Sequence, residues 1–399
     1  NRSAHRSGII TVLDVGSSKV CCIIAKLLPH ESGRALPHRT HRIKVIGIGH
    51  QKSQGMKSGV VVDLDRAEQA IRLAVDSAER MAGLTIDSLI VNVSAGRLKS
   101  ETASATIKLG RYEVAKADIT RVLLAGARQA LRAEREVVHS LAVGFSLDQE
   151  RGIRDPRGMV GEALGVDMHV LTADAVPLRN LELCVNRAHL SVERMVATPY
   201  ASGLAALVDD EAEMGAACID MGGGTTTMSV FVDGKFVHAD ALPMGGHHVT
   251  MDLARGLSTR LEDAERLKVM HGSALPASAA DDRDVVAIQP MGEDGEQALQ
   301  VPRSVMTRIV RARIEEILEL VRDRLNRSGY GSLVGRRVVL TGGASQLTGL
   351  PEAARRLLGR NVRLGRPLGV AGLPEAAKGP AFAAPVGLLI YPQVAEFEG

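Results

Sequence analysis

The sequence predicts an α/β protein of two lobes that share one design, with a small domain inserted into the first lobe. One motif predicts the lobes: an apolar strand, then an aspartate, a small-residue turn and a second apolar strand. The motif occurs near residue 9 and again near residue 216. A change of texture over residues 85–165 predicts the insertion. Because the two copies lie so far apart, the recurrence indicates a duplication and not an array of stacked repeats.

The composition limits the classes of function. The 399 residues suffice for about two to four domains. Hydrophobic residues make up 45% but aromatic residues only 2%, so aliphatic side chains must build the cores. With so few aromatic rings, stacking platforms for single-stranded nucleic acid are not expected. The net charge of +3 gives no general attraction for nucleic acid, and no nucleic-acid partner is predicted.

Cysteine usage and hydropathy point to a reducing cytosol. All four cysteines lie in apolar runs, without a Cys-x-x-Cys pair or metal-ligand spacing, so buried reduced thiols are expected. Asn1–Ser7 is polar, and no signal peptide is predicted. The longest charge-free apolar stretch, Ala381–Ala395, contains two prolines and is shorter than the ~20 residues of a membrane-spanning helix.

The first lobe opens with strands Ile9–Leu13 and Val20–Leu28 around the turn Gly16-Ser17-Ser18. A third strand at Ile43–Gly49 and a helix over Asp63–Met81 follow, the helix shown by apolar residues at helical spacing. The predicted insertion contains strands at Leu89–Val93, Ala103–Leu109 and Val137–Leu147 and a helix at Lys116–Arg132. Strand and helix then alternate over Met168–Leu171, Val176–Asn186, Leu190–Val196 and Tyr200–Val208.

The second lobe repeats the opening. Strands are predicted at Ala217–Met221, Thr226–Val232 and Phe236–Leu242, with a hairpin turn at Asp233-Gly234. Helices Leu253–His271 and Ser304–Asn326, strand Val338–Leu340 and a helical tail after Pro351 complete it. The predicted limits are 1–84 and 166–207 for the first-lobe core, 85–165 for the insertion, 208–245 and 326–399 for the second-lobe core, and 246–325 for a second-lobe subdomain.

Two hairpins carry a candidate phosphate site. In Asp14-Val15-Gly16-Ser17-Ser18-Lys19 an aspartate ends a strand, and the small residues present successive N–H groups that form an anion-binding turn. Asp220-Met221-Gly222-Gly223-Gly224-Thr225-Thr226 repeats this order. Three consecutive glycines lose much backbone entropy on folding, which is unfavourable in a hairpin that has only a structural role. The pair predicts a cleft for a nucleotide's phosphates, with the two aspartates holding Mg²⁺.

A third glycine turn, Thr341-Gly342-Gly343-Ala344-Ser345, lies between a strand and a helix and lets the backbone approach a flat ligand such as adenosine. Glu265 and Lys268 are three residues apart on one predicted helix face, so both can reach the same ligand edge. An exposed ion pair is the alternative for them. The sequence contains no P-loop and no G-x-G-x-x-G after the first strand, which excludes those two nucleotide-binding designs.

These hairpins and the later Gly-Gly turn resemble the actin-like (ribonuclease H-like) ATPase superfamily. Within it, four motifs are similar to the FtsA family of bacterial cell-division proteins: Asp220–Thr225, Met244-Gly245-Gly246, Asp263-Ala264-Glu265 with Lys268, and Asp155-Pro156-x-Gly158-Met159-x-Gly161. The likeness runs from about Ile9 to Tyr391. In that family a small strand-helix-strand-strand domain interrupts the first lobe, where the insertion lies here.

The resemblance implies ATP and Mg²⁺ as ligands and assigns the roles. Phosphate and metal binding fall to Asp14, Gly16, Ser17, Ser18, Lys19, Asp220, Gly222, Gly223, Gly224, Thr225 and Thr226. Adenosine binding falls to Gly246, Glu265, Lys268, Gly342, Gly343, Ala344 and Ser345. Asp14 and Asp220 are the expected metal residues, acting through water.

The same resemblance bears on hydrolysis, which needs a group that orients the attacking water. In chaperone relatives one carboxylate precedes the proline that is Pro199 here, and another follows the glycine–threonine turn. Thr198 and Thr227 hold these places in this sequence. Threonine is no carboxylate base, so we expect tight nucleotide binding with slow turnover, at most a weak ATPase, and a nucleotide that acts as an assembly switch.

The resemblance also implies partners: self-association into filaments, the tubulin-like FtsZ ring, and the cytoplasmic side of the inner membrane at the division site. Arg303 and Arg308, with Arg311 and Arg313, form a basic cluster that suits the acidic C-terminal peptide of FtsZ. A solvated helix face is the alternative. The family normally ends with an amphipathic membrane helix, whereas the last residues here, Ala395–Gly399, are acidic, so membrane contact through such a tail is implied by the family only.

Two other functions stay open: another actin-like scaffold, such as a pilus assembly adaptor, and a small-molecule kinase of the same fold. A kinase needs a base carboxylate beside the phosphates, and Thr198 and Thr227 argue against one. The Asp155–Gly161 motif favours the FtsA family over a pilus adaptor.

Overall fold

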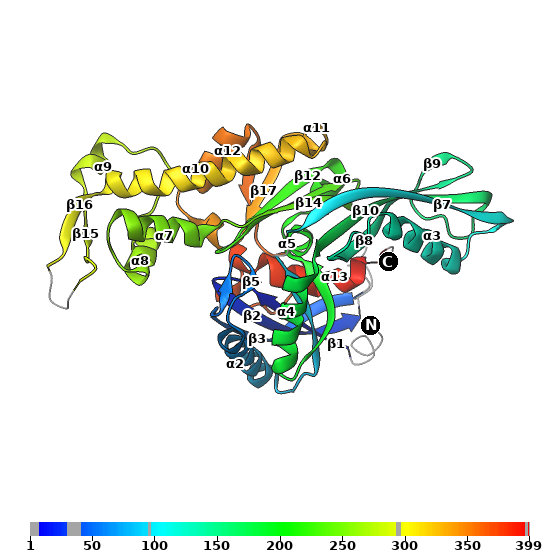
Figure 1. The fold of residues 1–399 in the computed structure, drawn as a ribbon, viewed down its shortest axis with the longest axis horizontal. Coiled ribbons are helices and arrows are strands. Elements are labelled where there is room, and N and C mark those ends of the chain that lie inside the picture. Colours follow the sequence, from blue (N-terminus) through cyan, green and yellow to red (C-terminus); the bar gives the residue numbers. More distant parts are fainter. Residues whose placement is uncertain (1–7, 30–40, 95–96, 293–296, 396–397, 399) are drawn as a thin grey trace.

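The computed structural model describes residues 8–29, 41–94, 97–292, 297–395 and 398. Two lobes lie one above the other at the centre of Figure 1. The inserted domain, with helix α3 (Lys116–Gln129), extends from them at one end. Helices α7 (Gly246–Gly256) and α8 (Leu261–His271) of the second lobe lie at the other end.

The two lobes contain sheets of the same topology. The first sheet has the order β11-β6-β1-β2-β3 and the second β14-β13-β12-β17-β18. In each sheet, three consecutive strands form an antiparallel meander. A later strand pairs in parallel with the first strand of the meander, and another later strand pairs in parallel with that one. This repetition confirms the predicted duplication. The bounds are β1 (Ile9–Val15), β2 (Lys19–Pro29), β3 (His41–Lys52), β6 (Ser88–Val93), β11 (Ser191–Ala197), β12 (Ala216–Met221), β13 (Thr226–Val232), β14 (Lys235–Leu242), β17 (Arg337–Thr341) and β18 (Asn361–Leu364).

One face of the first sheet is covered by α2 (Leu64–Ala82) and α4 (Ala175–Arg187). The Asp63 carboxylate accepts a hydrogen bond from the Arg66 N–H at 3.2 Å and caps the start of α2, and Gly83 ends it in the left-handed conformation. The buried face of α2 is mostly alanine, which lets it pack closely on β3. Two short strands, β4 (Met56–Lys57) and β5 (Val60–Val61), pair with each other in the segment between β3 and α2, and β5 packs against α4.

Two helices, α5 (Thr198–Ala206) and α13 (Ala383–Val394), pack against each other between the lobes. Their residues belong to a core that also takes side chains from both lobe sheets, such as Ile23 and Phe231. The backbones approach so closely that a Cβ on Gly387 would lie 1.7 Å from the Ala201 carbonyl oxygen. The lobes therefore share one core along this helix pair.

The inserted domain is a four-stranded sheet in the order β7-β10-β8-β9, covered on one face by α3. Its strands are β7 (Lys99–Glu113), β8 (Arg135–Leu147), β9 (Glu150–Ile153) and β10 (Val160–Asp174). It has its own core, in which Val122 of α3 packs with Phe145 and Met168 of the sheet. An independent core of this kind is typical of a separate domain.

Two strands lie in a different sheet from the one predicted. The sequence predicts Leu89–Val93 as a strand of the insertion, but it is β6 and pairs in parallel with β1 and β11 of the first lobe. The sequence predicts Met168–Leu171 as a strand of the first lobe, but it is the middle of β10 and pairs with β7 and β8. Apolarity alone does not tell one sheet from another, and Gly165 resembles a strand break although its missing Cβ makes room for the Ser146 hydroxyl.

The rest of the second lobe is largely helical. The predicted long helix is α10 (Arg303–Arg327), which buries Val310, Ile314, Ile317 and Val321 as expected. A β15–β16 hairpin (Val285–Ile288 and Leu299–Pro302) and α9 (Ala279–Arg283) lie at its start. The sequence did not predict β18, which separates α12 (Leu350–Leu358) from α13. Short helices α6 (Asp209–Met214), α11 (Gly331–Val334) and three 3₁₀ turns, η1 (Gly343–Gln346), η2 (Glu375–Ala377) and η3 (Pro380–Phe382), complete the chain.

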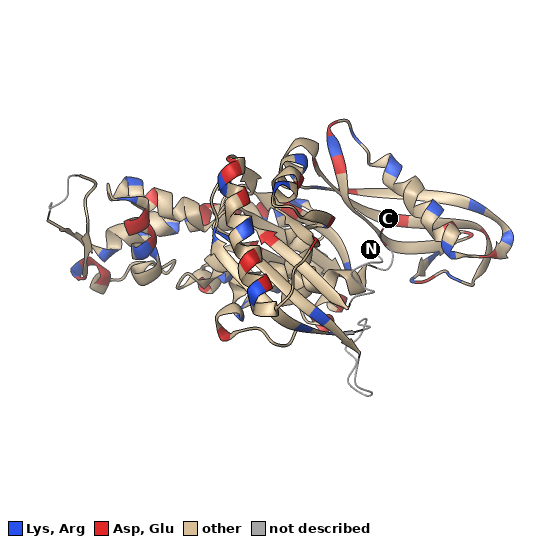
Figure 2. Cartoon of the chain, turned by 90° about the horizontal axis from the view of Figure 1, so that it is seen from below, with Lys and Arg blue, Asp and Glu red and all other residues tan. Residues whose placement is uncertain are grey.

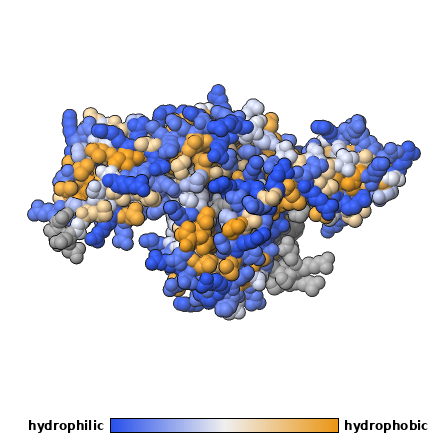
Figure 3. Space-filling model, in the orientation of Figure 1, coloured by the Kyte–Doolittle hydropathy of each residue, from blue (hydrophilic) through white to orange (hydrophobic). Residues whose placement is uncertain are grey.

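Charges of both signs are interspersed over the elements in Figure 2. On the face shown in Figure 3, apolar side chains form several groups separated by hydrophilic residues. The four cysteines are free and buried, as predicted. Among the described residues, no helix is both long and apolar enough to cross a bilayer.

Candidate nucleotide site between two glycine hairpins

The first hairpin joins β1 to β2. The Gly16 N–H donates to the Lys19 carbonyl at 3.0 Å and closes the turn. The Ser17 hydroxyl accepts from the Gly59 N–H at 2.9 Å, which ties the turn to the segment before β5. The Lys19 ammonium lies 3.5 Å from the centre of the Phe382 ring and donates to the Ala381 carbonyl at 2.5 Å. This cation is held at the seam between the lobes.

The second hairpin joins β12 to β13. The Gly222 N–H donates to the Thr225 carbonyl at 2.9 Å, the counterpart of the Gly16–Lys19 bond. The carbonyls of Gly222 and Gly223 accept from the N–H groups of Gly246, at 2.9 Å, and His247, at 2.8 Å, so the hairpin sits on the start of α7. This contact explains why the motif Met244-Gly245-Gly246 has glycine at its second position: a Cβ on Gly245 would lie 2.3 Å from the Gly222 carbonyl oxygen.

The hairpin tips face and touch each other. A Cβ on Gly223 would lie 1.6 Å from the Ser18 hydroxyl oxygen, and one on Gly224 would lie 2.3 Å from that of Ser17. Glycine is therefore needed in the second hairpin for close approach to the first. The structure therefore brings together the predicted phosphate-binding residues of the two hairpins, one from each lobe.

Two carboxylates lie beneath the tips. Asp14 is 9% exposed and Asp220 is 8% exposed. Burial raises the pKa of Asp14 to about 7, Lys19 opposes this, and the charge of Asp220 adds to it. Burial also raises the pKa of Asp220, against the hydrogen bond from the Ser202 hydroxyl and the charge of Lys19. Two acids that resist ionisation side by side fit a site completed by a bound cation.

The donor set suits Mg²⁺. Among the described residues, no three His, Cys, Asp or Glu side chains gather as a complete metal site. Mg²⁺ does not require one, because it usually keeps several waters and binds one or two carboxylates together with phosphate oxygens.

The predicted adenosine residues also meet. The Lys268 ammonium lies 2.9 Å from the Glu265 carboxylate and donates to the Gly246 carbonyl at 3.1 Å. A Cβ on Gly246 would lie 2.9 Å from the Ala344 Cβ, so α7 and the Gly342–Ser345 turn are in contact. Gly342 has φ 89°, and a Cβ there would lie 2.3 Å from an Asp220 carboxylate oxygen. Gly342 thus brings the predicted adenosine turn against the predicted metal carboxylate.

The two threonines at the positions important for hydrolysis are buried. The Thr198 hydroxyl lies 2.6 Å from that of Ser94 and accepts from the Asn92 amide at 3.0 Å. The Thr227 hydroxyl has no hydrogen-bond partner among the described residues, and its neighbour across the ladder is Asp220. Neither threonine offers a carboxylate, so Asp14 and Asp220 are the buried acids beneath the two hairpins.

Sequence reasoning missed the residues that support the hairpins. Asn92 on β6 accepts the Val15 N–H at 2.7 Å through its side-chain oxygen and also reaches Thr198. Ser202 on α5 donates to Asp220, and the Ala381–Phe382 turn holds Lys19. A polar asparagine within the apolar strand Ser88–Val93 was the available signal.

The basic cluster lies on α10, away from the hairpins. Arg303 is 3.9 Å from Asp284, Arg311 is 3.0 Å from Glu315 and Arg313 is 2.7 Å from Asp252. Arg308 is exposed. Intramolecular carboxylates thus neutralise much of the cluster, and its role in peptide binding stays a prediction.

Comparisons with known proteins agree with this geometry. A family model described as "Cell division protein FtsA" matches residues 217–387, and one described as "SHS2 domain inserted in FTSA" matches residues 95–172. A cell division protein FtsA of Rhizobium meliloti is 69% identical over 396 residues, covering 99% of this chain and 89% of that protein. The chain belongs to the FtsA family.

Solved structures of low sequence identity support the actin-like fold of this FtsA-family chain. The PilM–PilN type IV pilus biogenesis complex matches with a TM-score of 0.66 and 17% identity, over 96% of this chain and 98% of that one. MreB5 of Spiroplasma citri bound to ADP matches with a TM-score of 0.57 and 11% identity, over 96% of each chain. The fold class predicted from the sequence, including the inserted domain, is confirmed.

Proposed function

We propose that this FtsA-family protein binds ATP with Mg²⁺ between its two glycine hairpins and uses the nucleotide as a switch for filament assembly. One observation carries the proposal: two duplicated hairpins from different lobes meet above two buried carboxylates whose pKa values are raised. A solved structure of MreB5, which shares the fold, is bound to ADP and another to AMPPNP, and this supports a nucleotide as the ligand.

Each part of the site has a task. Backbone N–H groups and the Ser17 and Ser18 hydroxyls bind phosphate oxygens, and Lys19 adds a positive charge. When bound, Mg²⁺ neutralises phosphate charge, and Asp14 and Asp220 hold it through their carboxylates or bound water. Because the hairpin tips touch, the lobes must separate slightly to admit the phosphates and then close on them.

Hydrolysis is slow in this proposal. Thr198 and Thr227 cannot accept a proton from water, and Asp14 and Asp220 serve the metal. Since phosphoryl transfer depends on a positioned nucleophile, this arrangement favours a long-lived ATP state. Such a state suits filaments whose assembly depends on whether the lobes are open or closed.

At the cellular level, the protein polymerises and links the FtsZ ring to the cytoplasmic face of the inner membrane, through a tail beyond the described residues. Family membership supports this role. Arg303 and Arg308 remain the candidate residues for the acidic FtsZ peptide. The kinase and pilus-adaptor alternatives are less well supported, the first because of the two threonines and the second because of the 69% identity to an FtsA.

Titration of a fluorescent ATP analogue tests the nucleotide site. Wild type is expected to bind only with Mg²⁺ present, and Asp220→Asn to bind at least about tenfold more weakly, because a buried carboxylate–metal contact is lost. Asp76→Asn, an exposed aspartate on α2, is the matched control and keeps wild-type affinity. Equal affinity of wild type and Asp220→Asn would overturn the proposal. Phosphate release at many turnovers per second would overturn slow hydrolysis.

A further inference from the structure

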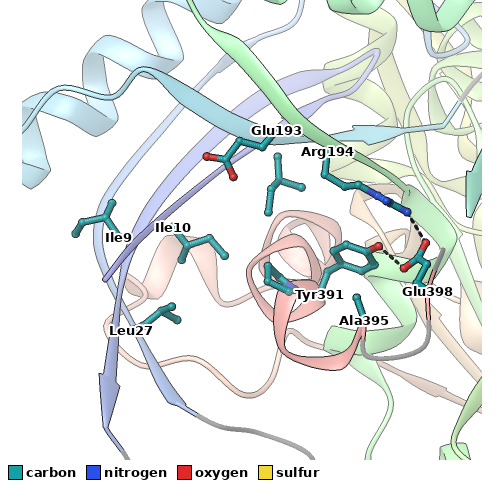
Figure 4. A pocket seen from close by; sticks show the side chains of 10 residues that line it. Ile9, Ile10, Leu27, Glu193, Arg194, Tyr391, Ala395 and Glu398 are labelled. Carbon is teal, nitrogen blue, oxygen red and sulfur yellow. Dashed lines mark hydrogen bonds and ion pairs between the residues drawn. The ribbon is translucent and has the colours of Figure 1, made fainter. Parts of the chain in front are cut away.

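A buried carboxylate that the proposed function does not use lies between the inserted domain and the first lobe. It belongs to Glu398, beyond the end of α13, and its side chain is 2% exposed. Arg194 of β11 donates to it at 2.5 Å, and the Tyr391 hydroxyl of α13 also donates (Figure 4). A third donor is the Nδ1 atom of His139 on β8. The carboxylate thus joins three elements that are distant in sequence.

The hydrogen bonds of His139 define its tautomer. Its Nε2 atom lies 2.9 Å from the Ala197 backbone N–H, which can only donate, so Nε2 accepts and carries no proton. The ring proton therefore resides on Nδ1 and is donated to Glu398. His139 is fully buried and packs edge-on against Tyr200 and Tyr391, with ring centroids 5.1 and 5.6 Å away. Both nitrogens are engaged and the ring has a single orientation.

A chain of hydrogen bonds leads from this ring to the first phosphate hairpin. Ala197, which donates to His139, is followed directly by Thr198. The Thr198 hydroxyl accepts from Asn92 at 3.0 Å, and Asn92 accepts from the N–H of Val15, which follows Asp14, at 2.7 Å. Glu398 is therefore linked to the candidate nucleotide site through three side chains and one peptide unit.

The charged and polar groups around Glu398 stabilise its ionised carboxylate. Burial raises the pKa of Glu398, but His139, Arg194 and the Tyr391 hydroxyl more than offset this and leave it below the usual range. Beside the carboxylate is a cavity of about 160 Å³ whose lining includes Ile9, Leu27 and Ala395. The hydrogen bonds from His139, Arg194 and Tyr391 therefore hold the Glu398 side chain beside this cavity.

We propose that His139, Arg194 and Tyr391 form a carboxylate-binding site whose ligand is Glu398 of the same chain, so that the Glu398 side chain joins the inserted domain to the first lobe. A second part rests on the proposed function: the docked carboxylate fixes the backbone at Ala197 and Thr198 beside the phosphates, and its release weakens nucleotide binding. The Glu398 side chain seated in the site and the match of one carboxylate to three donors identify the occupant.

Hydrogen exchange of the full chain without nucleotide tests the docking. Glu398→Gln keeps the shape of the side chain but places an amide N–H₂ against donors, which leaves buried polar groups unpaired. Amides of β8 and β11 are expected to exchange at least about tenfold faster than in wild type. Tyr391→Phe removes one donor and is expected to cause a smaller acceleration of the same amides.

Glu375→Gln is the matched control for this experiment. Glu375 also forms an ion pair, with Lys378 at 2.7 Å, but both side chains are exposed, so exchange in β8 and β11 should stay at the wild-type rate. Wild-type exchange of β8 and β11 in Glu398→Gln would overturn the carboxylate site. Equal acceleration in Glu375→Gln would overturn it as well, because the effect would not be specific to the buried carboxylate.

Titration of a fluorescent ATP analogue with Mg²⁺ tests the coupling to the nucleotide. Affinity is expected to fall several-fold in Glu398→Gln and to stay unchanged in Glu375→Gln. Accelerated exchange with unchanged affinity would overturn the coupling. If wild type binds no nucleotide, the proposed function fails, while the exchange experiment still decides the carboxylate site.

Discussion

Asp14→Asn is expected to stabilise the ligand-free protein while weakening Mg²⁺-nucleotide binding. In the folded protein, burial, the opposing charge of Lys19 and the added charge of Asp220 together raise the pKa of Asp14 from 3.8 to about 7. A carboxyl with a raised pKa resists ionisation, so the folded state loses stability as pH rises from about 4 to 7. Asparagine has a similar shape and does not ionise, so it removes this loss.

The size of the effect follows from the pKa shift. A shift of about 3 units at about 1.4 kcal/mol each gives roughly 4 kcal/mol at pH 8, where the folded-state carboxyl is ionised. At pH 5 only the unfolded state is ionised, and the difference falls to about 2 kcal/mol. Asp14→Asn should therefore gain more stability over wild type at pH 8 than at pH 5.

Denaturant unfolding at the two pH values, with and without Mg²⁺ and ATP, measures this. Ligand should raise the unfolding midpoint of wild type but hardly that of Asp14→Asn, because stabilisation by a ligand requires binding to the folded state. Asp76→Asn, exposed on α2, should match wild type throughout. If Asp14→Asn were no more stable than wild type at pH 8, or gained equally at both pH values, the account of Asp14 would be refuted.

Three further substitutions follow from the contacts. Gly387→Ala should destabilise the protein by at least about 2 kcal/mol in denaturant unfolding, because the new Cβ would lie 1.7 Å from the Ala201 carbonyl oxygen. Gly144→Ala, where the new Cβ meets open space, should cost less than about 1 kcal/mol. Equal losses of stability would contradict this account. Ser202→Ala removes a donor to Asp220 and should lower stability at pH 8 by about 1–3 kcal/mol; an unchanged unfolding midpoint would disprove the role of this bond. Lys268→Met should weaken ATP-analogue binding about tenfold, and unchanged affinity would remove that residue from the adenosine site.

The fold was predictable because the duplicated hairpin motif is encoded locally. An aspartate at the end of an apolar strand, followed by small residues, fixed the start of both sheets, and the structure shows the same strand order around each. The sheet membership of Leu89–Val93 and Met168–Leu171 was not predictable in the same way. Which sheet an apolar strand joins depends on partners distant in the sequence, and periodicity carries no information on them.

The hairpins that form the candidate site were found from glycine and aspartate patterns, whereas their supports were not. Asn92, Ser202 and His139 act through contacts to distant residues, and a single polar residue in an apolar run has no distinctive spacing. The basic cluster shows the converse. Arg311 and Arg313 stand out in the sequence as a run of cations, but folding places carboxylates beside them.

The path of the chain between the lobes limits how they can move. The chain passes to the second lobe after α5 and returns before α13, where the Leu368 N–H donates to the Ala205 carbonyl at 2.9 Å and the Ala371 N–H to the Ile43 carbonyl at 2.9 Å. The returning crossing is thus bonded to the end of α5 and to β3, so the two crossings form a hinge that permits rotation about the line joining them and resists sliding. Under the proposed function, a small separation of the hairpin tips around a nucleotide therefore becomes a larger displacement at the far ends of the lobes.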